Sequence, residues 1–289
     1  MKDVIAICTL DRPNEVGFLT KYLRKHLRWH GAIVVVDASQ DKNTRVALET
    51  LASDQDLILL SAPPGLPSQR NVALGFVRQT FDNNCVIHFL DDDVIPSSSY
   101  FSGARSLIHE SSPERPVIVG SQDLLLTKSN HGRILSRVGL KGRDGRVSVI
   151  GLSSPPVANS RSNQWNPGHG LSFRPADFPQ FEFDPSINFF GEDIEATLRL
   201  GQSGDICLAE GSKLLHVPGP RHGGRLMYDL RELELRMLLA IRFPSVVKKP
   251  LLLVAMLLEG FALLILPILP ARTRVGMINN RLRMLLRKR

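Results

Sequence analysis

Short, uninterrupted apolar runs constrain what this chain can fold into. They lie at residues 4–8, 32–36 and 86–90, and runs of this length are typical of strands buried on both faces of a parallel sheet. A further short strand is predicted at 57–60. Helical spacing of apolar residues fills the intervals at 14–28, 43–52 and 69–81. This alternation predicts an α/β domain with a mostly parallel central sheet flanked by helices.

Carboxylates follow two of these predicted strands. Asp37 closes the second run, and Asp91, Asp92 and Asp93 follow the strand at 86–90 directly. In open parallel sheets, ligands bind beyond the carboxyl ends of the strands. The sequence therefore predicts a ligand site at that edge of the sheet.

The three consecutive aspartates favour a metal. Side chains alternate along a strand, so Asp91 and Asp93 are expected on one side and Asp92 on the other. Two carboxylates on one side repel each other unless a cation lies between them, and their oxygens suit Mg²⁺ or Mn²⁺. The alternative is an acidic turn that caps a following helix near Pro96.

Several other polar residues are ambiguous when taken singly. Ser68 is a predicted N-cap, which puts Arg70 in the first turn of a helix. The helix dipole disfavours a cation there, so Arg70 is better explained if an anion lies nearby; the alternative is a solvent-exposed arginine. Glu192 and Asp193 open a predicted helix that ends at Gly201, which is also an ordinary place for acidic residues. His169 and His216 could each be structural.

Some classes of protein are excluded or weakened. The chain has no Gly-x-Ser-x-Gly elbow, no P-loop and no Gly-x-Gly-x-x-Gly fingerprint, which argues against serine hydrolases, P-loop kinases and classical dehydrogenases. Its 3 cysteines are scattered, which argues against a disulfide framework and favours a reducing compartment.

The net charge of +8 is confined to the C-terminal end. Of the 36 Lys and Arg residues, 10 lie in 242–289, where Glu259 is the one acidic residue, so residues 1–241 hold 26 basic and 27 acidic residues. A nucleic-acid partner is therefore not expected.

The C-terminal end predicts contact with an acidic membrane surface. Residues 251–266 are apolar apart from Glu259 and Gly260 and are nearly long enough to span a bilayer. Residues 275, 278, 282 and 285 form an apolar stripe among arginines, typical of an interfacial helix. We favour a monotopic or re-entrant anchor; a true span and a buried core helix are the alternatives. No signal peptide opens the chain, so the body is expected in the cytosol. The predicted domains are 1–227 and 228–289.

Seven motifs in order resemble those of the family-2 inverting glycosyltransferases, which have the GT-A fold. The motifs lie at residues 9–13, 36–41, 67–73, 89–94, 168–174, 190–194 with 199–201, and 215–216. The resemblance covers about residues 3–245 and implies a GT-A nucleotide-diphospho-sugar transferase fold, with C-terminal membrane-associated helices added.

The resemblance implies a donor site. Asp37 would bind the nucleobase or ribose with Arg70 beside it, and Asp91 would hold the nucleotide. Thr9 and Asp92 belong to the same donor-binding set.

The resemblance also implies a metal site and an acceptor side. Asp93 and Asp91 would hold a divalent Mg or Mn ion, and His216 would complete the metal shell or touch the diphosphate. Asp193 would be the general base, with Glu192 and His169 on the acceptor side.

The implied function is inverting transfer of a sugar from a nucleotide-diphosphate donor to a hydroxyl acceptor, a lipid-linked or cell-envelope glycan. The expected location is the cytoplasmic face of the cell membrane. Two alternatives stay open: a nucleotidyltransferase acting on sugar phosphates, and a non-catalytic sugar-nucleotide-binding membrane protein.

Overall fold

The structure is a computed structural model that describes residues 3–124, 145–156, 163–187, 190–217, 224–265 and 270–286. Contacts divide the chain into two compact units. The sheet unit comprises Met1–Lys128, Pro155–Asn188 and Glu192–Gly219, and the helical unit comprises Ser129–Ser154, Phe189–Gly191 and Pro220–Arg289. The predicted domain boundary at 227/228 stays a prediction.

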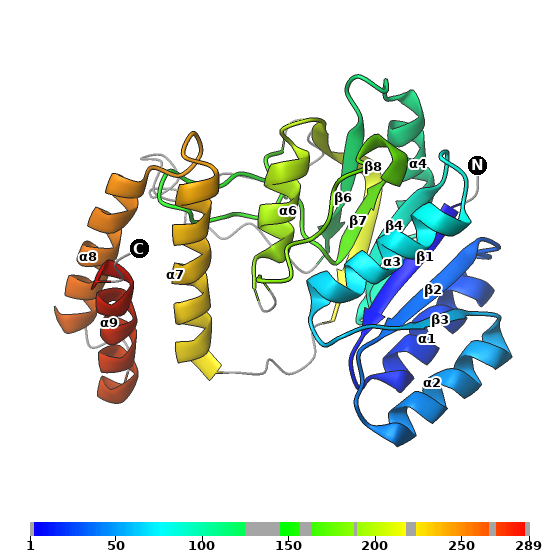
Figure 1. The fold of residues 1–289 in the computed structure, drawn as a ribbon, viewed down its shortest axis with the longest axis horizontal. Helices are drawn as coiled ribbons and strands as arrows, with labels where there is room; N and C mark the ends of the chain where they lie inside the picture. Colours follow the sequence, from blue (N-terminus) through cyan, green and yellow to red (C-terminus); the bar gives the residue numbers. More distant parts are fainter. Residues whose placement is uncertain are drawn as a thin grey trace. The chain divides into compact units, whose positions relative to one another are not determined.

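The sheet unit is built on a mixed sheet (Figure 1). Its strands are β1 Asp3–Thr9, β2 Ala32–Asp37, β3 Ile58–Ser61, β4 Val86–Asp91, β5 Val94–Pro96, β6 Val117–Asp123, β7 Gly170–Phe173 and β8 Asp205–His216. The described strands run in the order β3-β2-β1-β4-β7-β6-β8-β5. β1 to β4 are parallel to one another, β7 is antiparallel to β4 and β6, β6 is parallel to β8, and β5 is antiparallel to β8. The predicted α/β architecture with a mostly parallel sheet is confirmed.

Alternating side chains of the apolar strands bury both faces of this sheet. On one face, Val4, Ala6, Val34 and Val36 pack with α3 (Leu66–Thr80) and α6 (Glu192–Leu200). On the other face, Ile5, Ile7, Ile33 and Val35 pack with α1 (Pro13–Lys25), α2 (Lys42–Gln55) and α4 (Tyr100–Glu110). Helices on both faces explain why these strands are apolar at every position.

One local prediction and one alternative are wrong. Helix α3 begins at Leu66 with Gly65 at its N-cap, so Ser68 lies inside the helix; Pro67, with its fixed φ, suits the first turn and starts the helix earlier. No helix begins near Pro96. Residues Val94–Pro96 instead form β5 because they pair with the end of β8, and α4 starts at Tyr100.

The described part of the helical unit contains α7 (Gly224–Arg242), α8 (Lys249–Ile265) and α9 (Ala271–Leu286), and the three helices contact one another (Figure 1). The predicted apolar run is α8, and the predicted amphipathic segment is α9. Within the described ranges, no helix combines the length and apolarity needed to cross a membrane.

Candidate functional site

The carboxyl ends of three parallel strands bring polar side chains together. Thr9 of β1 is in register with Asp37 of β2, and Cys8 is in register with Asp91 of β4. Thr9, Asp37 and Asp91 therefore lie along one edge of the sheet, as the sequence predicts.

Asp91, Asp93 and His216 form a cluster at this edge. One carboxylate oxygen from each aspartate and one ring nitrogen of His216 lie within 4.8 Å of one another. His216 Nε2 is 3.3 Å from Asp93 Oδ1, and the Val217 amide donates to the Asp93 carbonyl at 2.9 Å. The antiparallel pairing of β5 with β8 places His216 opposite Val94 and so brings it to the aspartates.

Asp92 is not one of the residues of this cluster. β4 ends at Asp91 and a turn follows, so the strand alternation used to predict the direction of Asp92 does not extend to it. Its carboxylate accepts hydrogen bonds from Thr9 Oγ1 at 2.7 Å and from Arg12 Nη1 at 2.9 Å. Burial raises the pKa of Asp92 to about 6, although Thr9 and Arg12 oppose the shift. Arg12 also donates to Asp93 Oδ2 at 3.0 Å. Arg12 thus joins both aspartates, a role that the sequence motif around it did not suggest.

Asp123 is a further member of the site that the sequence analysis missed. It ends β6, its Oδ2 lies 3.9 Å from His216 Nδ1, and its Oδ1 accepts from the His216 amide at 3.4 Å. Burial acts to lower the pKa of His216, but the carboxylates of Asp93, Asp91 and Asp123 outweigh it and raise the pKa. The strand before Asp123 contains Gly120, Ser121 and Gln122, so no apolar run marked its end.

His169 stacks on His216, with ring centroids 4.7 Å apart. Its Nε2 is buried and has no hydrogen-bond partner among the described residues. Burial lowers the pKa of His169 to about 4, so the ring is neutral at neutral pH. Asp123, His169 and His216 make a second set of atoms within 4.8 Å that could hold a cation.

Arg70 is buried, 1% exposed, so its interpretation as a solvent-exposed arginine is wrong. Nη1 donates to Glu192 Oε1 at 3.2 Å, and Nη2 approaches Asp91 Oδ1 at 3.4 Å and the Gly168 carbonyl at 3.1 Å. The ion pairs of Arg70 are thus with Glu192 and Asp91, whereas the resemblance implied a place beside Asp37. A Cβ on Gly168 would lie 2.6 Å from Arg70 Nη2, so this close approach requires glycine.

Asp193 lies in the first turn of α6 and faces the same loop. Its Oδ2 accepts from the Gly168 amide at 3.0 Å and its Oδ1 from the Ile194 amide at 2.8 Å. Burial raises the pKa of Asp193 against these hydrogen bonds and the charge of Arg70. Burial and the neighbouring Asp193 charge likewise raise the pKa of Glu192, to about 7. A carboxylate with a raised pKa is suited to accept a proton near neutral pH.

Asp37 is the last residue of β2 and is held by hydrogen bonds from Ser39. Its Oδ1 accepts from the Ser39 amide at 2.8 Å and from the Ser39 hydroxyl. Gln69 donates from Nε2 to the carbonyls of Thr9 at 2.7 Å and Val36 at 2.9 Å, which ties α3 to the ends of β1 and β2. This arrangement fixes the position of Asp37 relative to the edge.

The site thus combines oxygen and nitrogen donors for a divalent cation with a buried carboxylate pair and a buried arginine. The metal cluster and Asp193 come from different strands and helices, and Arg70 contacts both Asp91 and Glu192. This arrangement can neutralise a phosphorylated leaving group on one side and accept a proton on the other.

The fold of the chain is the GT-A fold of nucleotide-sugar glycosyltransferases. A mannosyltransferase from Pyrobaculum calidifontis, solved with GDP-Man and Mn²⁺, is similar with a TM-score of 0.56 at 16% identity, covering 99% of this chain and 87% of that one. Glucosyl-3-phosphoglycerate synthase from Mycobacterium tuberculosis, in complex with phosphoglyceric acid, has a TM-score of 0.52 at 13% identity, covering 83% of this chain and 79% of that one. No protein-family model and no curated protein sequence matches the chain.

Proposed function

We propose that this chain is an inverting glycosyltransferase that moves a sugar from a nucleotide-diphosphate donor to a hydroxyl acceptor. The observation that carries the proposal is the Asp91, Asp93 and His216 cluster at the strand ends of a GT-A fold, with Asp193 held separately on α6. Family-2 membership belongs to the same proposal and is supported by the seven motifs. The mannosyltransferase with a similar fold was solved with GDP-Man and Mn²⁺, which favours a donor of this class.

The residues present fit a divalent cation. Asp91, Asp93 and His216 offer two carboxylate oxygens and one imidazole nitrogen within 4.8 Å of one another, a donor set suited to Mn²⁺ or Mg²⁺. Asp93 Oδ1 faces His216 while Oδ2 accepts from Arg12, so Arg12 holds the carboxylate with one oxygen directed at the cluster. A bound cation would supply positive charge to the departing diphosphate.

The chemical step assigns the proton to Asp193. The acceptor hydroxyl oxygen forms a bond to the anomeric carbon while the bond from that carbon to the diphosphate breaks, and the nucleoside diphosphate leaves with the electron pair. Asp193 takes the hydroxyl proton, and one displacement inverts the anomeric centre. Arg70 positions Glu192 beside Asp193 and holds Asp91.

The remaining roles complete the proposal. Thr9, Asp37 and Asp92 belong to the donor side, and Glu192 and His169 to the acceptor side. The acceptor is proposed to be a lipid-linked or cell-envelope glycan, and the location the cytoplasmic face of the cell membrane. The apolar and basic composition of α8 and α9 supports a membrane location.

The proposal can be tested by calorimetry with sugar nucleotides and Mn²⁺. We expect Asp93→Ala to abolish Mn²⁺-dependent nucleotide binding, because it removes one carboxylate of the cluster. Asp54→Ala, at an exposed position on α2, is the matched control and should bind as the native chain does. Unchanged affinity of Asp93→Ala for both metal and nucleotide would contradict the metal-dependent mechanism.

A further inference from the structure

Helix α8 has an exposed face made only of apolar side chains. Leu258 is 63% exposed and Phe261 is 61% exposed. The other large side chains exposed on this helix are Leu251, Val254, Leu257, Leu264 and Ile265. Their spacing of three and four residues places them on one side of the helix along its whole length. Such a continuous apolar surface is unusual on a protein that contacts only water.

The opposite side of α8 faces the protein. Leu252 and Met256 are fully buried, and Glu259 follows them at the helical spacing of three and four residues. Glu259 therefore lies on the protein side of the helix and away from the exposed apolar face. The acidic residue that interrupts the apolar run in the sequence does not interrupt that face.

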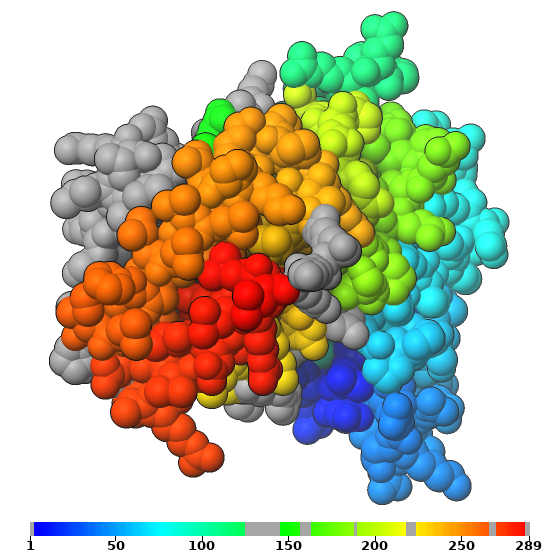
Figure 2. Space-filling view, turned by 60° about the vertical axis from the view of Figure 1, so that its left-hand side comes forward, coloured from blue at the N-terminus to red at the C-terminus, as the bar shows by residue number. Residues whose placement is uncertain are grey.

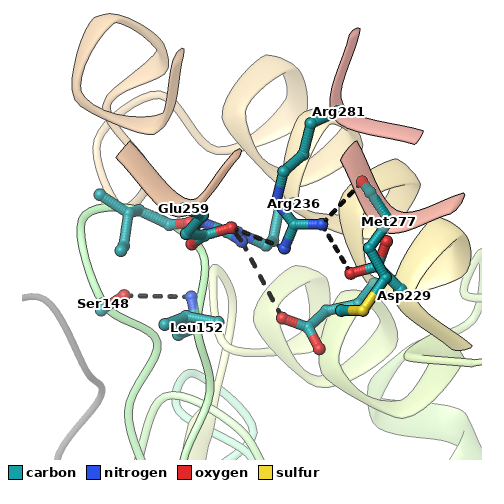
Figure 3. A network of polar contacts seen from close by, with 9 residues as sticks. Ser148, Leu152, Asp229, Arg236, Glu259, Met277 and Arg281 are labelled. Carbon is teal, nitrogen blue, oxygen red and sulfur yellow. Dashed lines mark hydrogen bonds and ion pairs between the residues drawn. The ribbon is translucent and has the colours of Figure 1, made fainter. Parts of the chain in front are cut away.

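Two arginines neutralise and hold Glu259 (Figure 3). Arg236 of α7 donates to both of its oxygens, from Nη1 at 3.1 Å and from Nη2 at 3.0 Å, and Arg281 of α9 donates from Nη2 at 3.0 Å. Arg281 also donates to Asp229 of α7 at 2.8 Å. Bidentate pairing is among the stronger arrangements for charged groups. The network fixes the rotation of α8 about its axis, so its apolar face stays outward.

The network has no net charge, because it pairs two arginines with two carboxylates. Arg236 and Arg281 are matched by Glu259 and Asp229, so the remaining basic residues of the helical unit stay uncompensated by it. Those exposed on α8 and α9, or next to α8, are Lys248, Lys249, Arg272 and Arg283. On α9, Arg272 and Arg283 lie on the same side of the helix as the exposed Val275 and Leu282. Basic and apolar side chains are thus exposed together, and Figure 2 shows α8 in orange and α9 in red next to each other on one face.

We propose that α8 and α9 dock in the plane of an anionic lipid surface, with the face from Leu251 to Ile265 inserted and the basic residues at the headgroups. Apolar insertion combined with attraction to anionic lipid is the pattern of interfacial helices. At 17 residues, α8 is about 25 Å long, shorter than the roughly 30 Å hydrocarbon core, and suits an in-plane position. A second copy of this chain fits less well because the same basic residues would face each other.

Flotation of the full-length chain with lipid vesicles tests this surface. We expect the chain to float with vesicles of phosphatidylcholine and phosphatidylglycerol, and to float less with phosphatidylcholine alone. The double variant Leu258→Ser/Phe261→Ser should lower the vesicle-bound to free ratio about tenfold or more, because two large apolar side chains no longer insert. Arg272→Gln/Arg283→Gln should weaken binding to the anionic vesicles and reduce the difference between the two lipid mixtures.

A matched control separates insertion from general loss of surface hydrophobicity. Val46→Ser/Phe18→Ser removes two side chains that are 51% and 59% exposed in the sheet unit, and should leave flotation unchanged. Circular dichroism should show native helix content in all variants. The proposal is wrong if the native chain stays free of anionic vesicles, or if Leu258→Ser/Phe261→Ser floats as well as the native chain. A stable dimer in sedimentation that these two changes dissociate, without vesicle binding, would assign the face to a second copy instead.

The network itself makes a second, independent measurement possible. Glu259→Gln removes the charge between the two arginines and should loosen the hold on α8. We expect faster hydrogen exchange in α8, with α3 in the sheet unit unaffected. Equal exchange in the native and variant chains would show that the network does not hold α8. That result would contradict the inference that the network keeps the apolar face of α8 outward.

Discussion

Arg70 and Glu192 form an ion pair at 3.2 Å that joins α3 to α6 within the site. The second terminal nitrogen of the same guanidinium lies 3.4 Å from Asp91. One buried cation is therefore shared by the metal-side aspartate and by the carboxylate pair that contains the proposed base. Changes at Arg70 should act on both sides of the reaction.

Arg70→Met should destabilise the chain and impair transfer together. Removal of the cation leaves Asp91, Glu192 and Asp193 with an uncompensated buried charge, which costs about 3 kcal/mol or more of the free energy of unfolding. Urea denaturation measures the loss, and Arg70→Lys should recover part of it. The exposed Arg115, whose side chain is 74% exposed, supplies the control: Arg115→Met should change the free energy by about 0.5 kcal/mol or less. Equal losses for Arg70→Met and Arg115→Met would contradict this role.

The pH dependence of transfer should report the Glu192 and Asp193 pair. Burial raises both pKa values, that of Glu192 to about 7, so the pair gains a proton as the pH falls through this range. A protonated base cannot accept the hydroxyl proton, and kcat/KM should therefore fall on the acidic side. Glu192→Gln removes a negative neighbour, which lowers the pKa of Asp193 and should move the acidic limb to lower pH. An unmoved limb would show that the two residues do not titrate together.

Asp193→Asn keeps the shape of the side chain but removes the proton acceptor. The expected loss is about 10²- to 10⁴-fold in kcat, with donor affinity nearly intact. Single-turnover rates and calorimetry with the donor separate the two quantities. If the variant transfers sugar at close to the native rate, another residue is the base, and Glu192 is the next candidate.

Asp123 should act on metal binding through His216. Asp123→Asn weakens the support of the His216 ring, and we expect the affinity for Mn²⁺ to fall about 10- to 100-fold, as for other partners of metal-binding histidines. Nucleotide binding without Mn²⁺ should change much less, because the expected effect of Asp123 is on the metal ligand His216. Asp54→Asn on the surface of α2 is the matched control. If Asp123→Asn binds Mn²⁺ with native affinity, Asp123 does not contribute to metal binding.

The parallel half of the fold was predictable because its strands are apolar at every position. β1, β2 and β4 each bury both faces, and their runs end at polar residues that mark one edge. Strands β5 and β6 of the other half were not predictable, because β5 is three residues long and the apolar run of β6 gives way to Gly120, Ser121 and Gln122 before the strand ends at Asp123. β5 is too short and β6 too polar in its second half to be identified from the sequence, and β8 pairs with both strands in the structure.

The site residues, too, were predictable only where they follow a strand that the sequence identifies. Asp37, Asp91 and Asp93 follow recognisable strands, so their shared edge could be predicted from the sequence. Asp123 could not, because its strand was not recognised, and Arg12 could not, because its contact with Asp92 depends on how the turn after β4 folds. The burial of Arg70 likewise follows from the loop around Gly168, which belongs to a region without clear periodicity.

Sugar transfer from a nucleotide-diphosphate donor can be tested by a screen of UDP-, GDP- and dTDP-sugars for donor hydrolysis with and without Mn²⁺. We expect slow release of a nucleoside diphosphate from at least one donor, dependent on Mn²⁺ and lost in Asp93→Ala. Release of pyrophosphate during incubation with a sugar phosphate and a nucleoside triphosphate would indicate a nucleotidyltransferase instead. Binding of a sugar nucleotide with no turnover, even with glycan acceptors present, would indicate a non-catalytic binding protein and rule out sugar transfer by this chain.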